Sequence, residues 1–145
     1  MLRVVIDTNI LVSALLSKKG APSQILDVWR ERKFLVVTSE AAILEVERVL
    51  DELKTRGKYA LSDDDSAEVL NLLRKDALLV PGDVDTRGSI PEDPDDEKFL
   101  SIALEGEAKI IISGDRHLLD LGKYQGITIQ TARQFLDSLQ TESSS

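Results

Sequence analysis

The sequence of 145 residues predicts an α/β protein, a three-layer α/β/α sandwich around a largely parallel sheet of about five strands. Two observations predict this fold class. Short apolar runs rich in valine and isoleucine alternate along the chain with segments whose apolar residues recur at helical spacing. The apolar runs are also nearly continuous, which is typical of strands that helices cover on both faces. Together these patterns favour a parallel sheet between two helical layers.

Five apolar runs are interpreted as strands because they are short and rich in β-branched residues. In chain order they are RVVI (3–6), FLVVT (34–38), ALLV (77–80), KIIIS (109–113) and ITIQ (127–130).

Seven segments are interpreted as helices from their periodicity. Ser39, Ser62 and Thr131 each precede such a segment and can accept hydrogen bonds from its first free N–H groups. Gly106 and Gly122 stand where two of the segments end. The predicted helices are Asn9–Leu16, Ala21–Arg32, Ser39–Leu53, Ser62–Lys75, Asp95–Glu105, Arg116–Leu121 and Ala132–Leu139.

No linker or repeat divides the chain, so residues 1–139 are predicted to form one domain. The polar tail 140–145 is predicted to be disordered. The longest segment without periodicity is 81–94, which contains three prolines and two glycines. The apolar N-terminal run is interpreted as folded core, because Asp7 and Asn9 interrupt it and it is too short to span a membrane.

The composition excludes several kinds of site. The chain has no cysteine, which rules out disulfides and thiolate metal sites and fits a reducing cytoplasm. The only histidine, His117, is interpreted as a surface or loop residue, and Trp29 and Phe34 as core or interface residues. A net charge of −8 disfavours binding to a polyanion, unless bound cations cancel part of the acidic field. Basic residues between Lys18 and Lys58 could then form a separate patch.

Two acidic residues follow predicted strands directly. Asp7 comes after the strand at 3–6, and Asp115 follows the strand at 109–113 after one glycine. Ligands of parallel sheets bind beyond the carboxyl ends of the strands, and neighbouring strands lie about 4.8 Å apart. If these two strands are neighbours, the two carboxylates could share one cation.

Helix phase supplies two further acids. Asp96 precedes Phe99, Leu100 and Ala103 by three, four and seven residues, so it is expected to point inward with that apolar face. Glu45 borders the apolar stripe of the helix at 39–53. Among the other acids near Asp96, Asp95 is interpreted as a helix cap, and Glu92, Asp93 and Glu97 as solvated charge.

Each of the four acids also has an ordinary explanation. Asp7 and Asp115 could be helix caps, Glu45 a solvated helix residue, and Asp96 a first-turn charge that complements the helix dipole. One shared site accounts for all four together. Carboxylates about 5 Å apart repel by about 3 kcal/mol per pair at an effective dielectric constant of about 20, so such a site must protonate or hold cations. Oxygen ligands of this kind suit Mg²⁺ or Mn²⁺ rather than zinc.

Four motifs resemble the PIN domain family, and within it the VapC-like toxin components of bacterial and archaeal toxin–antitoxin pairs. The motifs are VVIDTNILVSALL, SEAAILEVERVL, DPDDEKFLSIAL and IIISGDRHLLDL. They occur in the order and spacing of the family, and the resemblance covers residues 2–139.

The resemblance implies a Mg²⁺- or Mn²⁺-dependent endoribonuclease that hydrolyses RNA phosphodiester bonds. The acids of the family fall on Asp7, Glu45, Asp96 and Asp115, with the metal held by Asp7, Asp96 and Asp115. Asn9 and Ser113 match polar positions that would orient the ligands. The resemblance further implies an RNA substrate, a homodimer and a protein antitoxin. The lack of cysteine predicts a cytoplasmic location, and the lack of a long apolar run predicts no membrane partner.

Two other functions stay open on the sequence. IDTN could begin the DxDxT-type motif of a phosphatase or phosphotransferase with an aspartate nucleophile, although Asn9 stands where the second aspartate belongs. A catalytically silent PIN-fold binding module would bind metal without turnover.

Overall fold

A six-stranded sheet forms the centre of the molecule in the computed structural model, which describes residues 1–57 and 61–144. The strands lie in the order β3-β2-β1-β4-β6-β5, and every pair is parallel except β5 with β6. The predicted fold class is thus confirmed. The strands are β1 (Arg3–Ile6), β2 (Leu35–Thr38), β3 (Ala77–Leu79), β4 (Ile110–Ile112), β5 (Lys123–Tyr124) and β6 (Ile127–Gln130).

Strand β5 was not predicted, because two residues are too few to show a pattern. It pairs with β6 through a two-residue turn in which Gln125 and Gly126 have φ values of 47° and 86°. Two positive φ values are typical of the tight hairpin turn whose twist matches that of its strands.

The described chain has seven α-helices and one 3-10 turn. They are α1 (Thr8–Leu16), α2 (Ala21–Arg30), α3 (Glu40–Arg56), α4 (Asp63–Lys75), the 3-10 turn η1 (Pro94–Asp96), α5 (Glu97–Glu105), α6 (Arg116–Leu121) and α7 (Ala132–Ser144). Helix α3 is longer than predicted and ends at Gly57, whose left-handed φ of 64° closes it. Helix α7 continues through most of the tail that was predicted to be disordered, since no glycine or proline follows Leu139.

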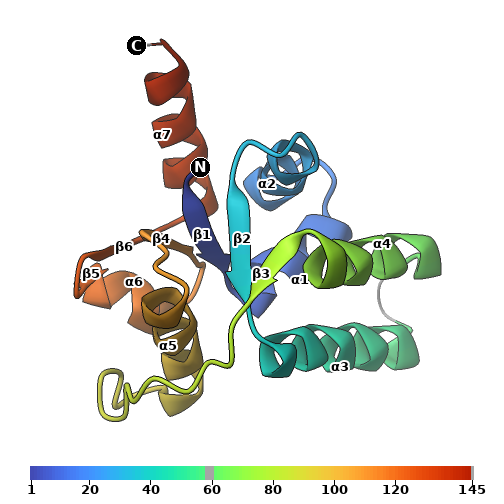
Figure 1. Ribbon diagram of the computed structural model, residues 1–145. Coiled ribbons are helices and arrows are strands. Elements are labelled where there is room, and N and C mark those ends of the chain that lie inside the picture. The colour runs from blue at the N-terminus through green and yellow to red at the C-terminus, as the bar shows by residue number, and fades with distance from the viewer. Residues whose placement is uncertain (58–60, 145) are drawn as a thin grey trace.

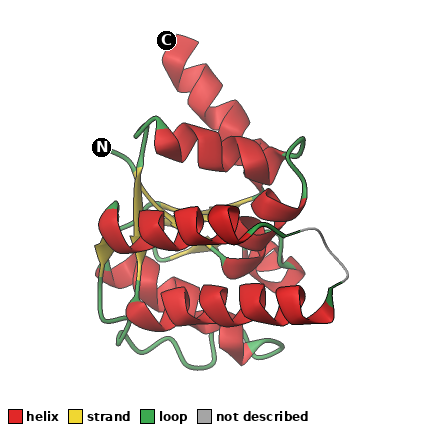
Figure 2. Ribbon diagram, turned by 90° about the vertical axis from the view of Figure 1, so that its right-hand side faces the viewer, coloured by secondary structure: helices red, strands yellow, loops and turns green. Residues whose placement is uncertain are grey.

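The two faces of the sheet carry different helices (Figures 1 and 2). Val4, Ile6 and Val36 pack in one core with α1, α2, α3, α4 and α7. The alternate residues Val5 and Val37 pack in a second core with α5 and α6. Each strand therefore buries both faces, which explains the nearly continuous apolar runs.

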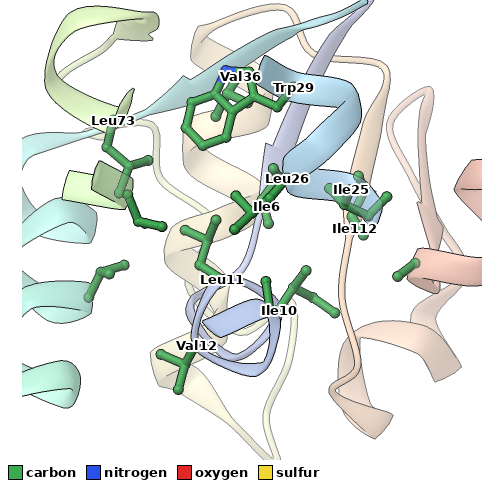
Figure 3. Close-up of a cluster of buried hydrophobic side chains, with 14 of the residues drawn as sticks. Ile6, Ile10, Leu11, Val12, Ile25, Leu26, Trp29, Val36, Leu73 and Ile112 are labelled. Atoms are coloured by element: carbon green, nitrogen blue, oxygen red, sulfur yellow. The ribbon is translucent and has the colours of Figure 1, made fainter. Parts of the chain in front are cut away.

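Helix α2 contributes three large side chains to the first core. Leu26 and Trp29 share this core with Ile6 of β1 and Val36 of β2, and Figure 3 draws Ile25 near Ile112 of β4. Trp29 is 2% exposed, which confirms its interpretation as a core residue. Phe34 is equally buried and meets the ring of Phe135 edge to face at 5.3 Å between centroids.

Candidate functional site

Strands β1 and β4 are neighbours, so the acids that follow them leave the sheet at one edge. Ile6 pairs with Ile112, and the backbone N–H of Asp7 donates to the carbonyl of Ile112 at 3.1 Å. Asp7 and Ser113 therefore come off adjacent strands side by side. This arrangement is the one that the shared-cation hypothesis requires.

Asp7 is both a helix cap and a buried member of the site. One carboxylate oxygen accepts the N–H of Ile10 at 2.9 Å, and the other accepts the hydroxyl of Ser113. Only 2% of the residue is exposed. Burial raises the pKa of Asp7, the hydrogen bonds from Ser113 and Ile10 lower it in part, and the charge of Asp115 raises it further.

Ser113 joins Asp7 to Asp115. Its fully buried hydroxyl donates to Asp7 and accepts the N–H of Asp115 at 2.9 Å. Asp115 caps α6, because its Oδ1 accepts the N–H groups of His117 at 2.9 Å and Leu118 at 3.1 Å. The hydroxyl of Ser113 thus fixes both the carboxylate of Asp7 and the backbone that carries Asp115.

Three carboxylates converge at this edge: Asp93, Asp96 and Asp115 each offer an oxygen within 4.8 Å of the other two. These residues are called the triad below. Asp93 is half-buried rather than solvated, so its interpretation from the sequence was wrong. It precedes η1, and its carbonyl accepts the N–H of Asp96 at 3.1 Å. This hydrogen bond closes the first turn of η1 and holds Asp93 near Asp96.

The triad has the electrostatics of a cation site. Burial and the nearby Asp115 and Asp93 raise the pKa of Asp96 to about 8. The Oδ2 atom of Asp96 is buried and has no hydrogen-bond partner among the described residues. An ionised carboxylate can only accept, so Asp96 can donate a hydrogen bond to Asp93 or Asp115 only when it carries a proton. A hard divalent ion would offset the repulsion between the three carboxylates and give Oδ2 of Asp96 a partner. The three carboxylates are therefore a donor set that fits Mg²⁺ or Mn²⁺.

Glu45 lies beside the triad but outside it. Thr8, which follows Asp7, donates its hydroxyl to Oε2 of Glu45. Lys98, two residues after Asp96, places Nζ 2.5 Å from Oε1. Within the described residues, the metal-sized group includes neither Glu45 nor Asp7. The ligand set Asp7, Asp96 and Asp115 stays a prediction, of which the structure brings Asp96 and Asp115 together.

Three residues of the site were missed from the sequence: Thr8, Asp93 and Lys98. The three-residue spacing in DPDD was a usable signal for Asp93. No local signal pointed to Lys98, because its contact with Glu45 joins residues 53 positions apart. Thr8 rather than Asn9 makes the polar contact after Asp7, and Asn9 is exposed.

The segment 81–94, the loop beneath α5 in Figure 1, is tied to the start of that helix. Glu97 is buried rather than solvated: its Oε1 accepts the N–H of Ile90 at 2.9 Å, and its carbonyl accepts the hydroxyl of Thr86 at 3.1 Å. Asp95 is exposed within η1, and neither η1 nor α5 has a side-chain cap, so the capping role predicted for Asp95 was also wrong.

Most of the basic residues expected to form a patch in the first half of the chain take part in ion pairs. Five of them pair with acids on the helical surface, and Lys58 lies outside the described residues. The pairs are Lys18–Asp65, Arg30 with Asp27 and Glu68, Arg32–Asp76, Arg48–Glu52 and Lys54–Asp63.

Comparisons with known proteins agree with this fold. The family described as PIN domain matches residues 3–117. The uncharacterized protein MJ1680 of Methanocaldococcus jannaschii is 31% identical over 147 residues, which cover 96% of this chain and 92% of that protein.

Two solved structures share the fold at low identity. One is a chain of VapBC2 from Rickettsia felis, solved bound to a DNA fragment from their promoter, with a TM-score of 0.55 and 10% identity over 90% of this chain and 98% of that chain. The other is PAE2754 from Pyrobaculum aerophilum, with a TM-score of 0.56 and 13% identity over 97% of this chain and 90% of that chain. The family match includes Asp7, Glu45, Asp96 and Asp115, and the chain belongs to the PIN domain family.

Proposed function

We propose that this protein is a metal-dependent endoribonuclease that hydrolyses RNA phosphodiester bonds with Mg²⁺ or Mn²⁺. The observation that carries the proposal is the triad, three carboxylates within 4.8 Å of one another, at the carboxyl edge of a parallel sheet in a PIN domain. We assign this activity to a single domain over residues 1–139.

In this proposal Asp93, Asp96 and Asp115 hold the ion. Asp7, which follows β1, lies next to this group through its contact with Ser113. A bound divalent ion supplies a Lewis acid that lowers the pKa of an attacking water and offsets charge on the phosphate. The residues around the triad position its ligands. Ser113 orients Asp7 and the backbone of Asp115, so the carboxylates need little rearrangement when the ion arrives.

We further propose that the protein acts in the cell as the toxin of a toxin–antitoxin pair. The fold shared with a chain of VapBC2 supports it. In this proposal the protein is a cytoplasmic homodimer that a protein antitoxin keeps inactive. None of the helices in the described residues has both the length and the apolar character of a membrane span.

The alternative function with an aspartate nucleophile is disfavoured by the surroundings of Asp7. Both of its carboxylate oxygens already accept hydrogen bonds, and 2% of the residue is exposed, so a phosphoryl group has little access to it. Labelling of Asp7 as an aspartyl-phosphate would revive this function.

The test is cleavage of linear and circular labelled RNA by purified protein with Mg²⁺ or Mn²⁺. We expect Asp115→Asn and Asp7→Asn to slow cleavage by about 100-fold or more, equivalent to about 2.7 kcal/mol of transition-state stabilisation. The matched control is Asp120→Asn, which removes an exposed carboxylate of the same helix, α6, and should cleave like the wild type.

Equal cleavage by Asp115→Asn and the wild type would contradict the assignment and indicate a contaminating nuclease. Ion binding without cleavage of any RNA would instead favour a catalytically silent binding module. Cleavage of circular RNA separates an endonuclease from an enzyme that needs a free end.

A further inference from the structure

The carboxylate of Glu45 differs from those of the triad in that protein groups already satisfy both of its oxygens. Oε2 accepts the hydroxyl of Thr8, and Oε1 lies 2.5 Å from Nζ of Lys98. The side chains of Lys98 and Glu45 are 32% and 23% exposed, so water screens this pair only in part.

Lys98 is held in place from two directions. Its backbone belongs to the first turn of α5, directly before the buried Phe99 and Leu100. Its ammonium group also lies 5.4 Å from the centroid of the Phe99 ring, a favourable distance for a cation over an aromatic face. The charge of Lys98 is therefore directed to Glu45 by the packing of α5.

The triad has no such partner. Within the described part of the chain, no lysine, arginine or histidine forms a salt bridge with Asp93, Asp96 or Asp115. The acids of the site thus fall into two groups. Three carboxylates lack a cation, and the fourth, Glu45, has one that the protein supplies.

We propose that Lys98 is the built-in cation of Glu45, so that the site binds one divalent ion at the triad and excludes a second ion from Glu45. This inference rests on the proposed metal site and adds its stoichiometry. A second ion at Glu45 would have to displace the ammonium group of Lys98 or bind beside it against like charge. Lys98 is thus a positioning residue, which keeps Glu45 directed to protein groups rather than to metal.

The test counts the Mn²⁺ ions bound per chain in the absence of RNA. Calorimetric titration gives the number bound, and the electron paramagnetic resonance signal of free Mn²⁺ gives the number left in solution. We expect one ion for the wild type and two for Lys98→Met, which keeps an unbranched side chain, one atom shorter and uncharged, and so frees Oε1 of Glu45. Lys98→Arg keeps the cation and should bind one ion. The double variant Lys98→Met with Glu45→Gln should return to one, because the second ion has lost its carboxylate.

The matched control is Lys109→Met, which removes an exposed lysine. Lys109 precedes β4, so it lies at the amino end of that strand, away from the triad at the carboxyl ends, and the variant should bind one ion. Circular dichroism and melting temperatures check that each variant folds. If Lys98→Met does not fold, Glu45→Gln alone decides. It should still bind one ion, and loss of that ion would overturn the inference.

Two ions bound by the wild type, or one bound by a folded Lys98→Met, would overturn the role of Lys98 and leave the proposed nuclease standing. A wild-type chain that binds no Mn²⁺ would overturn the metal site itself, and with it the proposed function. The ion count therefore separates the two failures.

Discussion

Asp96 has an unusual affinity for its proton, and this gives the site a pH dependence. Its pKa is raised from 3.8 to about 8 by burial and by Asp115 and Asp93. Between these values the folded chain keeps a proton on Asp96 that the unfolded chain has lost. The contribution of this group to stability is therefore present below its unfolded pKa and is lost as the pH rises toward about 8.

We predict that the melting temperature of the metal-free protein falls more steeply in the wild type than in Asp96→Asn between about pH 5 and about pH 8. The asparagine cannot ionise, so the variant lacks this contribution. Thermal denaturation in the presence of a chelator measures both slopes. Equal slopes would show that Asp96 is ionised in the folded chain throughout this range.

The same proton should compete with the metal. Ligands must be deprotonated to bind, so the apparent affinity for Mn²⁺ should rise about tenfold per pH unit below about pH 8 if one proton is displaced. Titration calorimetry in two buffers of different ionisation enthalpy measures the number of protons released. A pH-independent affinity would contradict the proton on Asp96.

At the level of single residues, the sequence was informative for acids whose position depends on a single strand or helix. Asp7 and Asp115 follow strands, and the neighbouring strands β1 and β4 bring Asp7 beside Ser113, whose hydroxyl contacts both residues. Asp93 was missed because it lies just before a 3-10 turn, where the helical period of 3.6 does not apply. Lys98 was missed because its partner lies on α3, and the packing of α3 near α5 is not written in local periodicity.

At the level of elements, the loop 81–94 shapes the triad through a chain of hydrogen bonds. The carboxylate of Glu97 accepts the N–H of Ile90, the carbonyl of Ile90 accepts the N–H of Asp93, and the carbonyl of Asp93 accepts the N–H of Asp96. Glu97 thus helps to hold Asp93 and the η1 turn that follows it and contains Asp96. No periodicity marks this loop, so only its anchors in the folded molecule reveal its role.

We predict that Glu97→Ala weakens Mn²⁺ binding by about tenfold, because Asp93 is then no longer held against Asp96. Glu97→Gln keeps an acceptor oxygen for the N–H of Ile90 and should bind nearly as well as the wild type. Calorimetric titration measures both. If the glutamine variant is as weak as the alanine variant, the charge of Glu97 matters and the hydrogen bond does not.

At the level of the whole molecule, the nearly continuous apolar strands and their alternation with helical segments were enough to predict three layers. Val4 and Ile6 enter one core and Val5 enters the other, so the sheet needs helices on both faces. The net charge was less informative. A charge of −8 argues against RNA, and Arg30, Arg48 and Lys54, three of the basic residues expected to form a patch, are paired with acids. The proposed ion at the triad is then the local positive charge that an RNA phosphate would meet.

An ion that binds only the folded chain must also stabilise the whole molecule. At a Mn²⁺ concentration about 100 times the dissociation constant, the free energy of unfolding should rise by about 2.7 kcal/mol. For a domain of this size the melting temperature should then rise by about 5 to 11 °C. We expect a chelator to reverse the shift, Asp115→Asn to abolish it and Asp120→Asn to retain it. A shift that persists in Asp115→Asn would place the ion elsewhere, because that variant loses a ligand of the triad while the sheet and both cores stay intact.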